Sequence, residues 1–78
     1  MNATRLRECL AALGWSQRGL AAFLECDERM VRRWAAGADQ VPAVVAAWIE
    51  ARAVHAEAHP PPIGWQRRPG QMRRSAPN

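Results

Sequence analysis

Residues 17–37, with the sequence QRGLAAFLECDERMVRRWAAG, decide how this chain folds. Apolar side chains recur through the first third of the stretch at intervals of one helical turn, and Ser16 just before it is a good N-cap. The pattern therefore predicts a short helix over residues 17–24. The positions expected to face inward are Leu20, Ala21 and Leu24.

A second helix should follow almost at once, because Asp27 is an N-capping residue and Gly37 suits the left-handed end of a helix. Each residue advances about 100° around the axis, and the expected helix then has two distinct faces. The inward face should hold Met30, Val31 and Trp34. The outward face carries Glu28, Arg29, Arg32 and Arg33, with the small Ala36 between them. Such a face is either only solvated, or it is held rigid so that it can bind a negatively charged ligand.

An apolar stripe near the N-terminus predicts another helix, from about residue 4 to Leu13, which Gly14 ends. The stripe consists of Leu6, Cys9, Leu10 and Leu13. Cys9 and Cys26 both stand where a helical pattern wants a small buried residue. We therefore expect two reduced structural thiols rather than a disulfide.

The next helix should begin with Pro42 at its first position and continue to about residues 55–59, where the prolines at 60–62 end it. The chain is thus expected to be all-α, a compact bundle of four to five helices over residues 1–59. Residues 60–78 form a basic tail rich in proline and arginine, which is not expected to fold independently. A chain of this length has room for one small core.

The net charge of +4 is unevenly distributed. Residues 1–59 contain seven arginines and seven acidic residues, whereas residues 60–78 contain four arginines and no acid. The complete absence of lysine favours phosphate or carboxylate contacts, but could equally be a base-composition bias of the genome. No apolar leader or membrane-length run is present in the sequence, so a cytoplasmic protein that contacts no membrane is expected.

Residues 17–37 resemble the helix-turn-helix of the Cro and C1 repressor type, a family of small helical regulators also called Xre-like. Six core places of that pattern carry suitable residues: Leu20, Ala21, Leu24, Cys26, Val31 and Trp34. The glycine usual at the ninth place is replaced by Glu25, so the turn must accept another residue at some conformational cost. The arginine-rich helix is also similar to small regulators of phages and mobile elements, including anti-CRISPR-associated repressors.

The resemblance implies a transcriptional regulator that binds double-stranded DNA in a sequence-specific way. It implies a dimeric repressor of a short inverted-repeat operator, with residues 27–37 reading the major groove. Expected base contacts are Glu28, Arg29 and Arg33, together with Arg32 on the same face. Expected backbone contacts are Ser16, Gln17, Arg18 and Asp27, through side chains or helix N-terminal amides. Because arginine pairs with guanine and glutamate accepts from cytosine, half-sites that contain G·C pairs are expected.

A homodimer is expected because regulators of this family commonly bind two half-sites. The interface candidates are Val44, Trp48, Ile49, Ile63 and Trp65. For the helical residues among them the alternative is that they only close the monomer's core. The tail could lie along the DNA backbone, dock Ile63 and Trp65 on a partner subunit, or have no role, and its paired arginines would also suit RNA.

Enzymatic readings of the sequence are weak. His55 and His59 are four residues apart, but no third histidine or cysteine lies nearby to complete a metal site. We expect neither an enzyme nor a metal or cofactor. The main rival is a protein-binding helical module, such as an antitoxin-like subunit whose helical domain and tail mask a partner protein.

Overall fold

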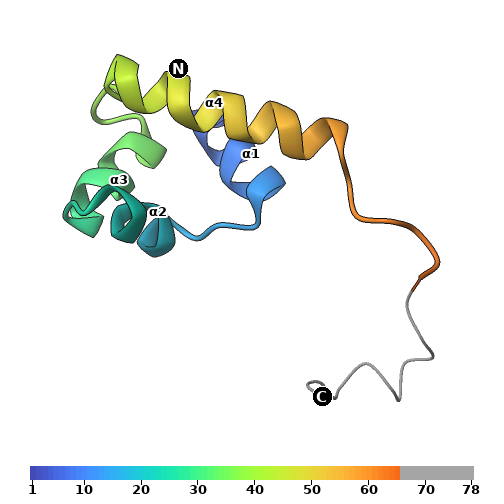
Figure 1. Ribbon diagram of the computed structural model, residues 1–78. Helices are drawn as coiled ribbons and strands as arrows, with labels where there is room; N and C mark the ends of the chain where they lie inside the picture. Colours follow the sequence, from blue (N-terminus) through green and yellow to red (C-terminus); the bar gives the residue numbers. More distant parts are fainter. Residues whose placement is uncertain (66–78) are drawn as a thin grey trace.

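Four α-helices make up residues 1–65, the part of the chain that the computed structural model describes (Figure 1). They are α1 (Ala3–Leu13), α2 (Gln17–Leu24), α3 (Glu28–Ala36) and α4 (Ala43–Ala58). No strand occurs within these residues, so the prediction of a small all-α bundle is confirmed for them. The four arginines of the basic tail lie outside the described residues.

The first three helices begin at the side-chain caps that their sequences provide. The side-chain oxygens of Asn2, Ser16 and Asp27 accept hydrogen bonds from backbone amides of the first turn, at 2.7, 2.9 and 2.9 Å. At the other end, α1 and α3 stop at Gly14 and Gly37, which have φ values of 70° and 80°. Local signals therefore set these boundaries, and the predicted helices over 17–24 and 27–37 are confirmed within one residue.

The start of α4 differs by one residue from the prediction. Pro42 is the N-cap rather than the first helical residue, because its ψ of 143° is extended while its carbonyl already accepts from Ala46 at 2.9 Å. The φ of proline, here −57°, suits both positions, so the sequence could not separate them. The helix itself begins at Ala43.

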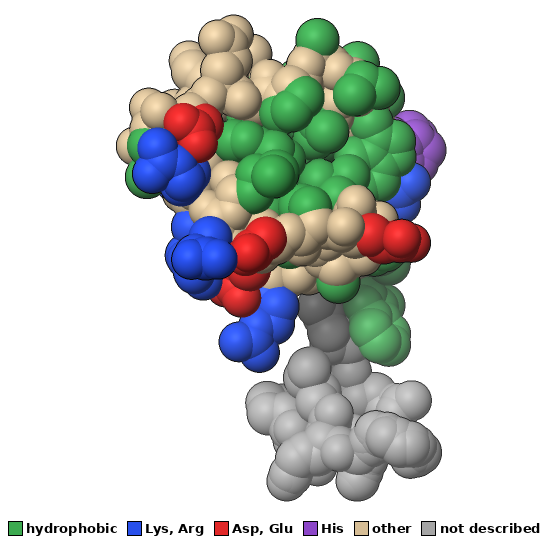
Figure 2. All heavy atoms as spheres, turned by 90° about the vertical axis from the view of Figure 1, so that its left-hand side faces the viewer, with side chains coloured by type: hydrophobic (Ala, Val, Ile, Leu, Met, Phe, Trp, Pro, Cys, Tyr) green, Lys and Arg blue, Asp and Glu red, His purple; other side chains and the backbone are tan. Residues whose placement is uncertain are grey.

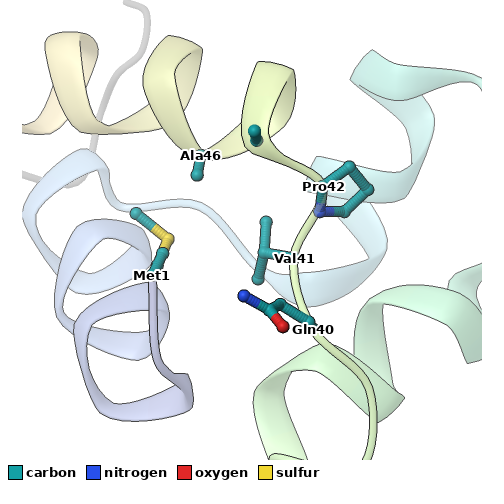
Figure 3. Close-up of a pocket in the computed structure, with 6 residues that line it drawn as sticks. Met1, Gln40, Val41, Pro42 and Ala46 are labelled. Atoms are coloured by element: carbon teal, nitrogen blue, oxygen red, sulfur yellow. The ribbon is translucent and has the colours of Figure 1, made fainter.

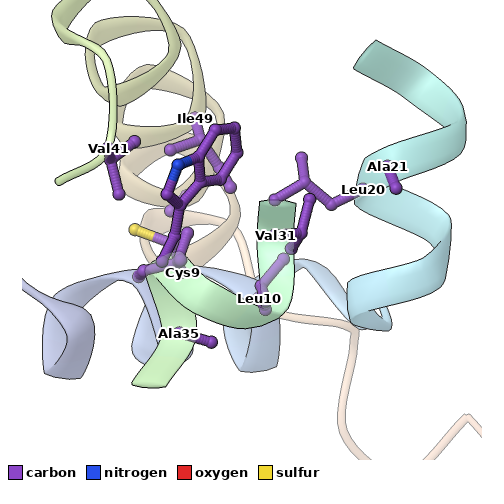
Figure 4. Packing of buried hydrophobic residues seen from close by; sticks show 11 residues of the cluster. Cys9, Leu10, Leu20, Ala21, Val31, Ala35, Val41 and Ile49 are labelled. Carbon is purple, nitrogen blue, oxygen red and sulfur yellow. The ribbon is translucent and has the colours of Figure 1, made fainter. Parts of the chain in front are cut away.

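The core lies where α1 packs against α4 and α3, and α2 packs against α3. Figure 4 shows side chains from all four helices converging there. The fully enclosed side chains are Leu6, Cys9, Leu20, Val31, Ile49 and Ala53, with Leu10, Ala21, Trp34, Ala35 and Val41 almost as buried. Every buried residue among the described ones is hydrophobic, so the core contains no charged side chain.

Two predictions about the core are wrong. Ile49 is completely buried, so it closes the monomer's core and cannot form a dimer interface. Met30 was expected to face inward but is 46% exposed, and Ala35 takes the inward place instead. At about 100° per residue, Val31, Trp34 and Ala35 span one arc of α3, while Met30 falls just beyond its edge.

An ion-pair cluster on the surface joins α1 to α4. Arg5 binds Glu50 through Nε and Nη2, the latter at 2.6 Å, and reaches Glu57 at 3.1 Å. The hydrogen bonds from Arg5 lower the pKa of Glu50 below its usual value. Beneath this cluster, Cys9 is a free thiol, and burial raises its pKa, which keeps it protonated.

Among residues 1–65, none of the helices has both the length and the apolar character that crossing a membrane would require.

Candidate nucleic-acid interface

The turn between α2 and α3 is tight and contains a strained residue. Glu25 has φ 55° and ψ 46°, in the left-handed region, and its amide donates to Ala22 at 3.2 Å. Cys26 then donates to Ala21 at 3.0 Å and turns the chain into α3. The cost expected for a non-glycine residue at this place is therefore present in the fold.

The six places that carried the sequence resemblance all lie in the core cluster. Leu20, Ala21, Val31 and Trp34 are buried, and Leu24 and Cys26 pack against them with partial exposure. These contacts fix α3 against α2, so the outward face of α3 is presented by a rigid pair of helices.

Three arginines project from the outward face of α3. The side chains of Arg29, Arg32 and Arg33 are 79%, 52% and 59% exposed. Glu28 is less exposed, at 32%, because it lies beside the inward arc of the helix. The structure thus brings together the four residues expected to contact bases, on one helix and on neighbouring positions.

Each of these arginines already has an acidic partner. Arg32 meets Glu28 at 2.8 Å, and Arg29 meets Asp27 at 3.4 Å. Arg33 is held by two hydrogen bonds to Asp39, at 2.6 and 3.2 Å. Arg33 lowers the pKa of the Asp39 carboxyl, which is therefore charged at neutral pH. An anionic ligand would have to exchange places with these carboxylates or bind the N–H groups that they leave free.

The residues expected to contact the DNA backbone lie around the start of α2 and α3. Arg18 is 84% exposed and lies 3.5 Å from Glu28, so it joins the α3 face from the neighbouring helix. The side-chain oxygens of Ser16 and Asp27 are occupied as helix caps, where they accept from the amides of Gly19 and Arg29. A contact with the DNA backbone at these places would therefore use the other amides of the first turns. Gln17 is partly exposed beside them.

No protein-family model, curated protein or solved structure matches this chain. The interface is therefore assessed from the arrangement of its own residues.

A second surface, on α4, is apolar. Its outer face consists of Val44, Ala47, Ala51, Val54 and Ala58, all exposed and within an arc of about 80°. Val44 is 78% exposed, and beyond the end of α4 Ile63 and Trp65 are 97% and 64% exposed. Figure 2 views the molecule from the end where α3 and the start of α4 lie. In this view hydrophobic side chains gather over the middle, and most of the arginines in view lie along one side.

An aromatic cluster borders this outer face. The ring of Trp15 stacks on Phe23 with centroids 4.6 Å apart and lies 5.7 Å from Trp48. The guanidinium of Arg52 lies over both tryptophan rings, at 5.3 and 5.7 Å. Trp48, predicted as an interface residue, is therefore partly used inside the monomer, although it keeps some exposed surface.

A pocket away from these surfaces offers little chemistry. One pocket of about 430 Å³ lies between the start of α1 and the loop that enters α4 (Figure 3). Its lining residues are Met1, Gln40, Val41, Pro42, Ala43 and Ala46, whose side chains contain no acid, base or nucleophile. His55 and His59 stack on each other at 4.3 Å, and the described residues contain no group of three potential metal ligands.

Sequence reasoning missed Asp39 as part of the site. It lies six residues after Arg33, beyond the end of the helix, where no helical periodicity connects the two. The available signal was Gly37, because a left-handed residue at a helix end folds the following chain back over the last turn.

Proposed function

We propose that this protein is a sequence-specific regulator that binds double-stranded DNA and reads the major groove with α3. The observation that carries the proposal is the outward face of α3. Three exposed arginines project from a helix that is capped at both ends and packed against α2. An α-helix fits the major groove, and arginine is the side chain best suited to bind guanine there. The helix pair with its short turn supports a helix-turn-helix of the Cro and C1 type.

The net charge near α3 is slightly positive, which favours binding to DNA. Arg18, Arg29, Arg32 and Arg33 face Asp27, Glu28 and Asp39, so four positive and three negative charges leave an excess of one. A site dominated by phosphate attraction would carry a larger excess. The balance instead favours a surface in which specific base contacts contribute strongly, while Gln17, Arg18 and the uncapped amides at the starts of α2 and α3 would contact the DNA backbone.

A second copy of the chain is the proposed occupant of the outer face of α4. A two-fold interface brings the same patch of both copies together, and a patch without charged residues avoids repulsion between like charges. The alanines Ala47, Ala51 and Ala58 permit close helix packing. A helix of this length is only about 24 Å long, and one helix face falls short of the roughly 800 Å² per partner that stable interfaces bury. Ile63 and Trp65, exposed beyond α4, are suited to supply the remainder.

A repressor of an inverted-repeat operator is the form of regulator that these features favour. Two copies joined through α4 would present two α3 helices to successive major grooves, provided that their spacing is about one helical turn of DNA, some 34 Å. The resulting target is a palindrome whose half-sites contain G·C pairs.

The decisive experiment is titration of the protein with random-sequence duplex DNA at increasing salt, followed by selection of preferred duplexes from a randomised library. DNA binding requires affinity that falls linearly with salt on logarithmic axes, together with recovery of a common sequence. A module directed only at proteins would show neither result. A labelled single-stranded RNA titrated in parallel addresses the RNA alternative.

A protein-binding module is the second candidate, because the outer face of α4 and Phe23 of α2 each expose apolar side chains of the kind that partners cover. In that case the helical domain would form complexes without nucleic acid, and replacing the arginines of α3 would leave those complexes intact.

A further inference from the structure

Asp39 differs from the other acidic neighbours of α3 in how it holds its arginine. Its Oδ2 accepts from Nε of Arg33 at 2.6 Å and its Oδ1 accepts from Nη2 at 3.2 Å. Two parallel bonds of this kind fix both the direction and the rotation of the planar guanidinium. Arg29 and Arg32 are each held by a single side-chain contact with an acid, about which the guanidinium can turn.

The backbone around Asp39 is tied to the same arginine. The amide of Ala38 donates to the carbonyl of Arg33 at 2.9 Å, and the amide of Asp39 lies 3.4 Å from that carbonyl. Gly37, with φ 80°, makes this reversal of the chain favourable. The position of the Asp39 carboxylate relative to Arg33 is therefore set by the end of the helix and not by a flexible segment.

The side-on pair leaves the far end of the guanidinium available. Among residues 1–65, Nη1 of Arg33 has no hydrogen-bond partner, and Nη2 uses only one of its two N–H groups. One N–H from each nitrogen forms a fork that points along the axis of the side chain. A fork of this shape matches the two acceptors O6 and N7 that guanine presents in the major groove.

We propose that Asp39 is a positioning residue for guanine recognition, which holds Arg33 so that its outer fork meets O6 and N7 of one guanine in each half-site. The inference rests on the proposed DNA-binding function and adds to it the base that Arg33 reads and the residue that makes the reading selective. Asp39 itself touches no base in this arrangement.

A positioning role for Asp39 predicts two opposite effects when Asp39 is replaced, one on affinity for random duplexes and one on preference for guanine. Removing Asp39 removes a negative charge beside the DNA, so affinity for random duplexes should rise. Arg33 then becomes free to turn toward phosphates or other bases, so preference for guanine should fall by about 3- to 10-fold, the cost of ordering one long side chain. A surface acid with no positioning role would produce the first effect without the second.

The test uses the full chain, with the variants Asp39→Asn and Asp39→Glu in the wild-type and Arg33→Ala backgrounds. Each protein is used to select duplexes from a randomised library. Competition with single-base variants of the duplex that the wild type prefers then measures discrimination at each position. Asp39→Asn removes the charge, whereas Asp39→Glu keeps the charge and changes the reach of the carboxylate. Circular dichroism verifies that each variant is folded.

The expected result is that both variants lose preference at one guanine position while only Asp39→Asn gains affinity for random duplexes. In the Arg33→Ala background, preference at that position is already lost and neither variant changes it further. In the free wild-type protein, the Nε proton of Arg33 should exchange more slowly with water than in Asp39→Asn, as measured by nuclear magnetic resonance.

Two different failures are distinguishable. If the wild type selects a sequence but Asp39→Asn keeps its full guanine preference, or changes preference equally with and without Arg33, the positioning role is overturned and the DNA-binding function stands. If the wild type binds no duplex, both are overturned.

Discussion

Arg29 and Arg33 differ in how firmly each is held before any ligand arrives. Arg33 is fixed by two bonds to Asp39, whereas Arg29 has one longer contact with Asp27, a residue whose carboxylate is also the cap of α3. Two exposed arginines on one helix can therefore contribute differently to specificity even though the sequence presents them alike.

Replacing either Arg29 or Arg33 with alanine should cost about 1–3 kcal/mol of binding free energy per half-site and relax preference at particular base pairs. Arg18→Ala is the matched control, because an arginine that meets only phosphate should weaken specific and random duplexes alike and reduce the salt slope by about one. Competition with single-base operator variants makes the comparison. Folded Arg29 and Arg33 variants that retain full sequence preference would show that the α3 face is only a solvated surface.

Trp34 contributes at the same scale through burial. It is only 4% exposed and belongs to the buried core cluster. Trp34→Ala should lower the free energy of unfolding by about 3–5 kcal/mol, because the lost contacts leave a cavity. For a domain of this size that loss should abolish most of the folded population, as thermal circular dichroism would show. Met30→Ala, at a half-exposed apolar residue of the same helix, is the control and should lower the melting temperature far less.

At the scale of elements, the turn between α2 and α3 contains a residue in a strained backbone conformation, which lowers the free energy of unfolding. Glu25 is the one described residue other than glycine with a positive φ, at 55°. Left-handed backbone costs an ordinary residue roughly 1–2 kcal/mol, whereas glycine adopts it freely but loses more chain entropy on folding.

Glu25→Gly should therefore raise the free energy of unfolding by up to about 1 kcal/mol, since relief of the strain exceeds the added entropy cost. Urea denaturation measures the change. Ala22→Gly, on the exposed side of α2, supplies the control and should lower stability by about 1 kcal/mol. A Glu25→Gly protein less stable than the wild type would mean that the turn is not under strain.

The ion pair between Arg5 of α1 and Glu50 of α4 should make the stability of the protein depend on pH. Arg5 lowers the pKa of Glu50 below its usual value of 4.5. A carboxylate whose pKa is depressed by folding stabilises the protein above that usual value, and the contribution disappears as pH falls through the lower, folded pKa. The pair is partly exposed, so the effect on stability should be small but measurable.

Arg5→Gln should therefore be less stable than the wild type at neutral pH, and the difference should shrink as the pH falls through the lowered pKa that Glu50 has in the folded protein. Urea denaturation at a series of pH values provides the comparison. Arg7→Gln is a suitable control, because Arg7 binds the carbonyl of Ala35 and no carboxylate. A constant difference across the pH range would exclude the proposed linkage.

At the scale of the whole molecule, the two candidate surfaces lie on different helices. The arginines of α3 are exposed on that helix, whereas the outer face of α4 lies on the side of α4 opposite the buried Ile49 and Ala53. This arrangement suits a dimer in which protein contacts and DNA contacts are separate, so that each can be removed without the other.

Ala51→Glu places a charge at the centre of the outer face of α4 and should convert a dimer into monomers, because a charge buried against its own copy is repelled. Analytical ultracentrifugation measures the mass. Ala11→Glu makes the same change at an exposed alanine of α1 and should leave the mass unchanged. The Ala51→Glu monomer should keep its preference for a single half-site and lose affinity for the inverted repeat. A wild type that is monomeric at micromolar concentration would contradict the interface.

The sequence by itself determined the helices and most of the buried positions on α1 and α2. Caps such as Ser16, Asp27 and Gly37 act within a few residues, so they place helix ends wherever the helices are later packed. The strong stripes of α1 and α2 likewise predicted buried residues, because one helical face must leave water for these short helices to be stable. The exposed arginine face of α3 followed from the same periodicity.

Only the tertiary structure decided which residues at the margins of a face are covered and which distant side chains meet. Met30 is exposed and Ala35 buried because the contacts of α3 with α1 and α2 cover the arc from Trp34 through Val31 to Ala35, and Ile49 is enclosed where α4 contacts α1. The pair of Arg33 with Asp39 depends on a reversal of the chain after a helix, and the cluster around Arg5 joins residues 45 positions apart. Such contacts arise from packing and chain reversal, which periodicity along a single helix does not encode.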